Sequence, residues 1–437
     1  MKYIMYFVIL TVTFATFLSS VHLLPGVAKF LPEMLSVLVA AFVIVAGAQG
    51  GFGRVSAKYW LAFSVTAVAL LCGALANFEA PGPLMAGLRY YVRCIPFFFV
   101  PAICKFDERQ LWKFMRLILA ICLIQLPISA YQRFRLVATG HNSGDKVYGS
   151  LMLSGTLSLF LICVLCVLTV LAVRKRVGIP TYVGLFVALL LPMSINETKI
   201  TFFVLPPCLL ASFVFASDRG KRLRIAAVGV SALCVAGAIF IPLYDYFNAL
   251  YSYDEHPFRI EDYFDPKSTT NDTLETGASV GRRREAGRID CVVVPLQELS
   301  RDPIKLAFGL GMGAISKSSL GPAYTGRYNG IYGRYQSSLG TFLFETGLLG
   351  TAMIAVLHGL IFLDALAVAR QDKGLTGMLA VGWLPTVLLA SLGLFYIDLH
   401  IYESFGYLFW FFSGWIAFQR ARERGPPDAA GHVAGPR

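Results

Sequence analysis

Four arginines, Arg282, Arg283, Arg284 and Arg288, gather in a long polar stretch between two groups of apolar segments. A helix over 279–299 would place Arg284 and Arg288 one turn apart on a shared face. Guanidinium groups bind phosphate oxygens through pairs of parallel hydrogen bonds. The run therefore predicts a phosphate or pyrophosphate site. Contact with anionic lipid headgroups, or pairing with the acidic half of the same stretch, is the alternative.

A second arginine pair, Arg89 and Arg93, is spaced by four residues within an otherwise apolar segment. Charges at membrane depth are costly, and they are usually partnered or functional. We interpret the pair as part of the same phosphate site. The alternative is that both side chains extend to the lipid headgroups.

Two carboxylates are candidates for proton transfer. Glu345 is predicted about two turns into an apolar helix, where an ionisable group is a functional candidate by default. Glu197 lies in the segment Asn196-Glu197-Thr198-Lys199, between two apolar runs. Either carboxylate can act as a general base. Lys199 would add a cation to the phosphate site, or it would form an interfacial ion pair with Glu197.

Several other kinds of site are not indicated. No cluster has metal-ligand spacing, and no Walker loop for a nucleotide phosphate occurs, so we expect neither a metal nor a cofactor. The glycines of Phe308-Gly309-Leu310-Gly311-Met312-Gly313 lack a surrounding βαβ unit and predict a flexible turn instead. His400 and the other lone histidines predicted on the same side are interpreted as carrying no function.

The composition predicts which elements must position these residues. Of the 437 residues, 56% are hydrophobic and 15% are charged, whereas soluble domains carry about 25% charged residues. Apolar runs of about 20 residues recur, the length that crosses roughly 30 Å of hydrocarbon. We expect an all-α polytopic membrane protein with about 12 transmembrane helices, at 3–24, 30–49, 59–77, 84–104, 112–131, 148–173, 179–195, 200–217, 223–245, 338–369, 375–397 and 402–419.

The net charge of +12 is explained by topology and gives no reason to expect nucleic-acid binding. The Lys and Arg clusters fall in alternate gaps between the predicted helices, as the positive-inside rule requires if both termini are cytoplasmic. The predicted parts are transmembrane helices 1–9 (1–245), a large, partly helical periplasmic loop (246–337), transmembrane helices 10–12 (338–419) and a disordered cytoplasmic tail (420–437).

The chain resembles the O-antigen polymerase and ligase superfamily of bacterial membrane glycan-assembly proteins. Four stretches between about residues 88 and 368 carry the resemblance in order. They are Leu123 to Phe134, Asn196 to Lys199, Gly287-Arg288 with Asp302-Pro303 and Gly309-Leu310-Gly311, and Gln336-Ser337-Ser338 with Glu345-Thr346-Gly347.

The resemblance implies a metal- and nucleotide-independent glycosyltransferase in the inner membrane. Its donor would be an oligosaccharide on undecaprenyl pyrophosphate, and a chain-length regulator is a further candidate partner. Matched by position, Arg288 would bind the pyrophosphate, and Lys199 stands where relatives have an arginine at a helix start. Tyr335 stands where relatives often have a histidine, so the base is not identified by the match.

A polymerase of an O-antigen or exopolysaccharide repeat unit is the function we favour from the sequence. Ligase-type transfer of the glycan to a lipid acceptor is one alternative. A flippase for lipid-linked glycans, or another secondary transporter, is the alternative without catalysis. Transporters of this size commonly contain paired repeats with broken helices, and no such internal symmetry is evident here.

Overall fold

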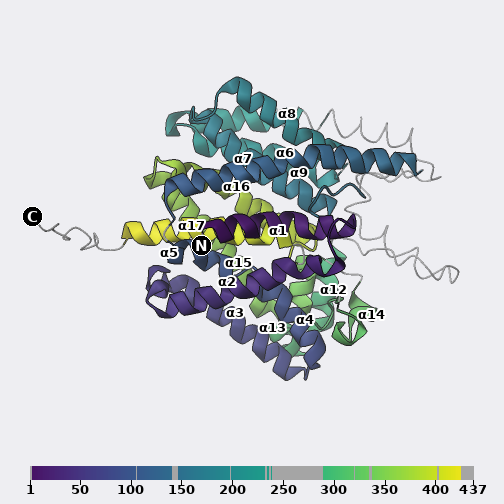
Figure 1. Cartoon of the computed structure of the whole chain (residues 1–437). Helices are drawn as coiled ribbons and strands as arrows, with labels where there is room; N and C mark the ends of the chain where they lie inside the picture. The colour runs from purple at the N-terminus through teal and green to yellow at the C-terminus, as the bar shows by residue number, and fades with distance from the viewer. Residues whose placement is uncertain are drawn as a thin grey trace, which may run out of the picture.

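Helices make up most of the described part of the chain, and no strand occurs in it (Figure 1). The computed structural model describes residues 2–104, 106–139, 146–196, 198–231, 234–235, 238, 289–318, 320–333, 337–400 and 403–424. Within these ranges, seven helices are long and apolar enough to cross a bilayer, which supports an all-α membrane protein. They are α1 (Lys2–Ser20), α2 (Leu31–Ala48), α3 (Ala57–Ala76), α6 (Glu108–Ala138), α7 (Ser154–Val173), α15 (Ser338–Gln371) and α16 (Leu375–Tyr396).

The other described elements are shorter or more polar. Five of them are helices of the bundle: α4 (Pro81–Val92), α5 (Pro96–Cys104), α8 (Ile179–Ile195), α9 (Lys199–Ala216) and α17 (Glu403–Arg424). Short turns of helix complete the set: η1 (Gly26–Phe30), η2 (Gly51–Arg54), η4 (Arg219–Lys221), α12 (Asp290–Leu299), α13 (Pro303–Phe308), η6 (Pro322–Tyr324) and α14 (Asn329–Tyr332).

Seven spanning helices in the described residues are fewer than the twelve or so predicted. The predicted single helix 84–104 is wrong, because the chain leaves α4 after Val92 and starts α5 at Pro96. Proline lacks an amide hydrogen and disfavours helical geometry in the residue before it. The predicted helices 179–195 and 200–217 fold as α8 and α9 but are short, and most of 223–245 lies outside the described residues.

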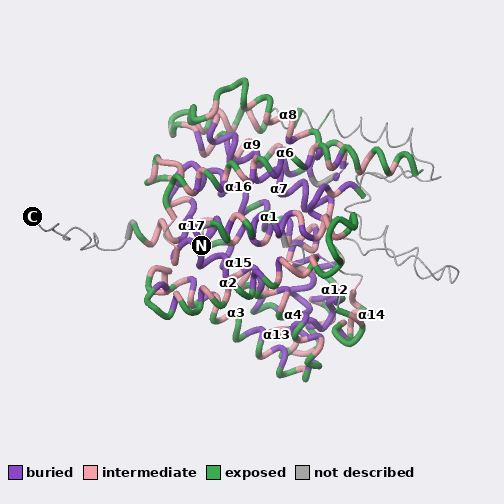
Figure 2. Tube along the Cα trace, in the orientation of Figure 1, coloured by how far each residue is buried: buried purple, intermediate pink, exposed green. Residues whose placement is uncertain are grey.

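The centre of the bundle is built on α7 and α16, which are apolar on every side. Of the seven long helices they are the most enclosed, as expected for a helix without a polar face. α16 packs between α7 and α15, α9 covers α7, and α17 packs against α5 (Figure 2). The remaining long helices expose one apolar side outward, as a lipid-facing helix must.

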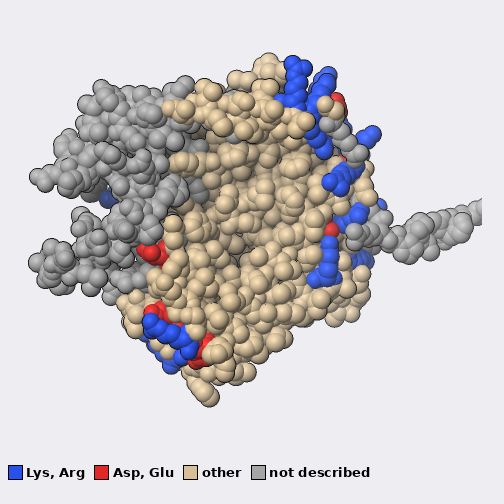
Figure 3. All heavy atoms as spheres, turned by 180° about the vertical axis from the view of Figure 1, so that it is seen from behind, with Lys and Arg blue, Asp and Glu red and all other residues tan. Residues whose placement is uncertain are grey.

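Charged side chains leave a wide uncharged belt around the visible face of the molecule (Figure 3). Lys and Arg gather at the end of the bundle where α1 begins and α17 ends (Figures 1 and 3). We call this the basic end and the other the opposite end. Four cations of the basic end, Arg174, Arg222, Arg370 and Lys373, line one pocket there. A belt of this kind is the surface that lipid covers.

A buried carboxylate joins two helices near the basic end. Asp364 of α15 is 3% exposed and pairs with Lys58 of α3 at 2.5 Å. Its other oxygen accepts a hydrogen bond from the Tyr59 hydroxyl at 2.8 Å. Removal of either partner would leave a buried charge without full compensation, which is strongly destabilising.

At the opposite end, α15 is kinked where residues 309–316, which we call the glycine loop, pack against it. Gly347 has φ +64°, and a Cβ there would lie 2.5 Å from the Ala307 carbonyl oxygen. Gly309 faces it, also at positive φ, with its own Cβ position 2.5 Å from the Glu345 carbonyl carbon. The predicted flexible turn at 308–313 is therefore a close-packed segment, with Met312 only 2% exposed.

This kink predicts different effects for two glycines of the same helix. Gly347→Ala should destabilise the protein by about 1–3 kcal/mol, because it adds a clash to a conformation that L side chains rarely adopt. The matched control is Gly359→Ala, since nothing lies within 4 Å of a Cβ at Gly359. Thermal unfolding in nanodiscs should show a lower Tm for Gly347→Ala alone. Equal Tm values for the two variants would contradict the close packing.

Candidate functional site

Glu345 anchors the glycine loop beneath the opposite end of the bundle. Its carboxylate is 1% exposed. Oε1 accepts hydrogen bonds from the backbone N–H of Ile315 and Ser316, at 3.2 and 3.0 Å, and from the Ser316 hydroxyl at 2.7 Å. Oε2 accepts one from the Tyr91 hydroxyl at 3.0 Å. Four donors satisfy a buried carboxylate well, so this geometry favours an anchoring role.

The same loop holds α4 in place. The Cβ of a residue at Gly87 would lie 2.4 Å from the Gly313 nitrogen, so helix and loop meet backbone to backbone. Consecutive tyrosines of α4 then bond to two different segments: Tyr90 donates to the carbonyl of Lys317, just after the loop, at 3.3 Å, and Tyr91 donates to Glu345 of α15. The loop thereby sets the position of the two predicted arginines, which lie on α4 and just after it.

Arg89 and Arg93 lie together, as their spacing predicts, and both face Glu33 of α2. The distances to Glu33 Oε1 are 2.7 Å from Arg89 and 3.6 Å from Arg93. Both guanidinium groups also lie over the Tyr90 ring, at 5.2 and 5.3 Å from its centroid. The Arg89 Nε is buried and has no hydrogen-bond partner within the described residues. Arg89 therefore forms an ion pair with Glu33, and its Nε–H is still able to donate a further hydrogen bond.

His400 joins this pair from the connection between α16 and α17. Arg93 donates to the His400 carbonyl at 3.3 Å. The His400 Nδ1 lies 2.9 Å from the hydroxyl of Ser338, and that hydroxyl donates to the Ile397 carbonyl at 3.1 Å. Because the Ser338 hydrogen is used there, we assign the imidazole hydrogen to Nδ1. Nε2 is then the acceptor nitrogen, and it is buried without a partner in the described part of the chain.

An aromatic cavity of about 360 Å³ lies next to these residues. His400, Tyr90 and Tyr91 line it near the arginines, and His358 lines it deeper in the bundle, where its Nδ1 lies 2.8 Å from the Ser391 hydroxyl. The remaining lining is almost entirely apolar, for example Phe342 and Trp410. Arg89 and Arg93 do not line the chamber themselves, but Tyr90 and Tyr91, which lie between them in sequence, do. Cations beside an apolar chamber suit a ligand with an anionic head and a hydrocarbon tail. We call Arg89, Arg93, His400 and this chamber the head-and-tail site.

The described structure does not place the other predicted site residues in the head-and-tail site. Arg284, Arg288, Glu197 and Tyr335 lie outside the described residues. Lys199 begins α9, which packs against α7 and α16, whereas α4 packs against η6. No group of three or more metal-ligating side chains occurs among the described residues.

The sequence did not predict three residues at or beside the head-and-tail site, which are Glu33, His400 and Ser338. His400 has no neighbour in sequence that would mark it, and its partner Ser338 is 62 residues away. A signal existed for Glu33, since a carboxylate in an apolar helix needs a cationic partner. No family model matches the chain, and no curated protein matches it.

The buried imidazole predicts a pH dependence of stability. Burial, and then the nearby Arg93 guanidinium, lowers the pKa of His400 to about 3, against about 6.5 in an unfolded chain. Between these values the unfolded state binds more protons, so the free energy of unfolding decreases as the pH falls below about 6.5. The slope contributed by one such group is at most about 1.4 kcal/mol per pH unit.

His400→Gln should therefore flatten the decrease in Tm between pH 6.5 and pH 4, measured by thermal unfolding in nanodiscs. The control is His22→Gln, which removes an exposed histidine and should leave the wild-type profile. An unchanged profile in His400→Gln would mean that the imidazole is not enclosed as described.

Proposed function

We propose that this chain is a membrane glycosyltransferase of the polymerase type. It would transfer a glycan from undecaprenyl pyrophosphate to an acceptor sugar hydroxyl at the periplasmic face of a bacterial inner membrane. In this proposal the chain crosses the membrane about 12 times and the basic end is cytoplasmic, in accord with the positive-inside rule. The opposite end, with the head-and-tail site, then faces the periplasm.

The observation that carries the proposal is the adjacency of two arginines and a bare imidazole nitrogen to an apolar chamber. An isoprenyl pyrophosphate has the same two halves. Its phosphate oxygens match the Arg89 and Arg93 guanidinium groups, which bind such oxygens through charge-assisted hydrogen bonds. The first part of its hydrocarbon chain matches the chamber of about 360 Å³.

The chemistry follows from the leaving group. The acceptor hydroxyl oxygen forms a bond to the anomeric carbon of the donor sugar, and the bond from that carbon to the pyrophosphate oxygen breaks. Negative charge grows on the departing pyrophosphate, where the two arginines stabilise it. The proton of the acceptor hydroxyl goes to a base, and His400 Nε2 is our choice because it has no hydrogen-bond partner within the described residues and belongs to a residue that lines the chamber.

Substrate binding would make His400 a better base. The pKa of about 3 applies with Arg93 beside the ring and no anion bound. A bound pyrophosphate brings negative charge close to both groups, which favours the imidazolium form and raises the pKa. General bases work best when their pKa lies near the working pH. Proton transfer would then be efficient only when the donor is in place.

Arg284 and Arg288 remain candidates beside this set, because they belong to the predicted loop 246–337, which would reach the same phosphate. Lys199 and Glu197 remain candidates from the predicted periplasmic end of the helices that flank them. Glu345 is the weaker base candidate because all of its described contacts are donors that hold the loop. Ligase-type transfer to a lipid acceptor uses the same donor chemistry and stays an alternative. A flippase is the second alternative, because it too would bind a lipid-linked glycan.

Arginine variants test the pyrophosphate role. Arg89→Lys and Arg93→Lys should each lower polymer formation by purified enzyme about thirty- to a thousand-fold, or about 2–4 kcal/mol, because a point charge does not reproduce two parallel hydrogen bonds. Arg288→Lys belongs to the same series. The matched control is Arg327→Lys, an arginine of the same end that pairs with Glu79 at 3.8 Å outside the site. Near-normal rates in both Arg89→Lys and Arg93→Lys, with matched Tm values, would reject the site.

A deletion strain separates the enzyme from the transporter. It should accumulate single lipid-linked repeat units while the earlier sugar-transfer steps continue, because each unit is made and exported but not joined. Lipid extraction and mass analysis of the glycan measure this directly.

Complementation with His400→Gln should leave the same single units. Loss of the base should slow polymerisation about 10²–10⁴-fold. Intact polymer lengths together with a block in the export of a solute would favour the transporter.

A further inference from the structure

A second cavity, of about 260 Å³, lies on another flank of the bundle. It is enclosed by α6, α7, α8, α16 and α17, and its lining is almost wholly apolar. Along α7 it extends from Leu171, next to the basic end, to Phe160. Those eleven steps correspond to about 16 Å at the usual helical rise, which is about half of a hydrocarbon layer of roughly 30 Å. The cavity therefore has the depth of one leaflet.

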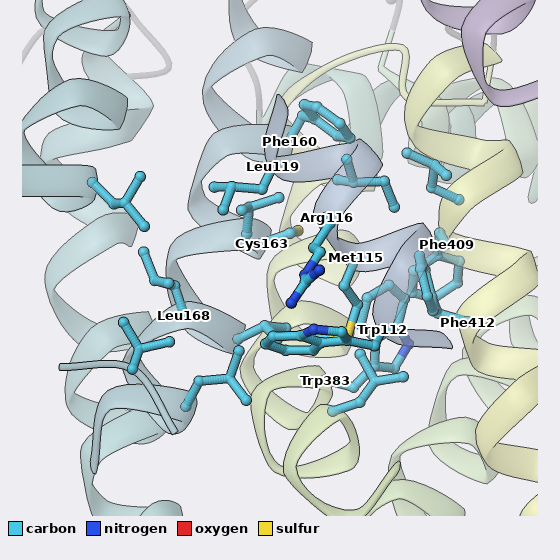
Figure 4. A pocket seen from close by; sticks show the side chains of 18 of the residues that line it. Trp112, Met115, Arg116, Leu119, Phe160, Cys163, Leu168, Trp383, Phe409 and Phe412 are labelled. Carbon is cyan, nitrogen blue, oxygen red and sulfur yellow. The ribbon is translucent and has the colours of Figure 1, made fainter. Parts of the chain in front are cut away.

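One charged residue, Arg116 of α6, lines this cavity. Figure 4 shows its guanidinium directed into the cavity above the Trp112 indole, with Leu119, Phe160 and Cys163 nearby. The guanidinium carbon lies 5.1 Å from the Trp112 ring centroid. Arg116 is eight residues from the start of α6, about 12 Å along the helix, and a cation at such depth is costly without an anionic partner.

The surrounding charges favour an anionic ligand. Arg116 forms no ion pair with any residue that the structure describes, and its neighbours on the same face of α6 are Lys113 and Arg109. The two acids at the start of α6 are engaged: Asp107 accepts from the Gln110 N–H at 2.7 Å, and Glu108 accepts from the Leu375 N–H at 3.1 Å. The next turn at this end carries Arg174, Lys175 and Arg176, directly before the lining residue Val177.

We infer that this groove binds an anionic phospholipid from the leaflet at the basic end. One acyl chain occupies the cavity, and the phosphate pairs with Arg116, whose position over Trp112 orients it by a cation–π contact. The amphipathic stem of an arginine lets its head reach a phosphate near the membrane surface. Because the groove lies outside the head-and-tail site, the inference does not depend on the proposed function.

The acyl chain would also touch a wall shared with the head-and-tail site. Phe405 and Phe409 of α17 line both cavities, and their rings are stacked at 5.9 Å. An acyl chain that fills the second cavity packs against Phe405 and Phe409. Empty space against large side chains forfeits dispersion contacts, so an occupied groove should also stabilise the fold.

Lipid retention by the full-length protein tests the inference. The protein is purified with equal amounts of phosphatidylglycerol and phosphatidylcholine, and the bound lipids are counted by native mass spectrometry. The wild type should retain phosphatidylglycerol preferentially. Arg116→Ala should lower that retention about fivefold, the equivalent of about 1 kcal/mol for one headgroup contact, and should leave phosphatidylcholine unchanged. Lys113→Ala, which removes a neighbouring charge that does not line the cavity, is the matched control.

A second measurement does not depend on Arg116. Val164→Phe narrows the cavity without changing a charge, and it should lower the retention of both phospholipids. Phosphatidylglycerol with brominated acyl chains should quench the fluorescence of wild-type protein more than that of Trp112→Phe, since Trp112 lines the cavity. Equal losses in Arg116→Ala and Lys113→Ala would show only surface attraction and would overturn the inference. Retention of an isoprenyl phosphate in place of phosphatidylglycerol would overturn it as well.

Discussion

The buried carboxylate of Glu345 is the interaction on which the opposite end of the molecule depends. It accepts hydrogen bonds from Ser316, from the Ile315 backbone and from Tyr91, and so joins α15, the glycine loop and α4. A charge enclosed in a membrane bundle is stable only when such donors satisfy it. The positive φ at Gly309 and Gly347 lets the backbones approach closely enough for these bonds to form.

The position of the two arginines follows from this anchor. Tyr91 ties α4 to Glu345, and the helix ends at Val92, four residues before Pro96. Arg93 consequently stands at a break, where it reaches both Glu33 and the His400 carbonyl. An unbroken helix would have directed the chain past Glu33 and the His400 carbonyl. The proline that makes the predicted helix 84–104 wrong is thus part of the reason why the candidate site exists.

The interior contains two cavities, for which we propose two different lipids. In these proposals the chamber near Arg89 and His400 takes the lipid of a substrate, and the groove near Arg116 takes a phospholipid of the other leaflet. Phe405 and Phe409 stand between them. In both places a cation lies at the polar end of an apolar space, because a headgroup and a hydrocarbon chain must be matched together.

The sequence by itself determined the class of protein and the sites of most helices. Lipid exposure depends on the length and polarity of each segment, which are local properties. Arg89 and Arg93 could be selected as candidates for the same reason, since a charge in an apolar run is costly wherever the run packs. Tertiary structure alone decided their partners. The contact between Ser338 and His400 spans 62 residues, and the contact between Ser316 and Glu345 spans 29. Such pairs depend on which helices pack together, and packing between apolar surfaces leaves no local mark in the sequence.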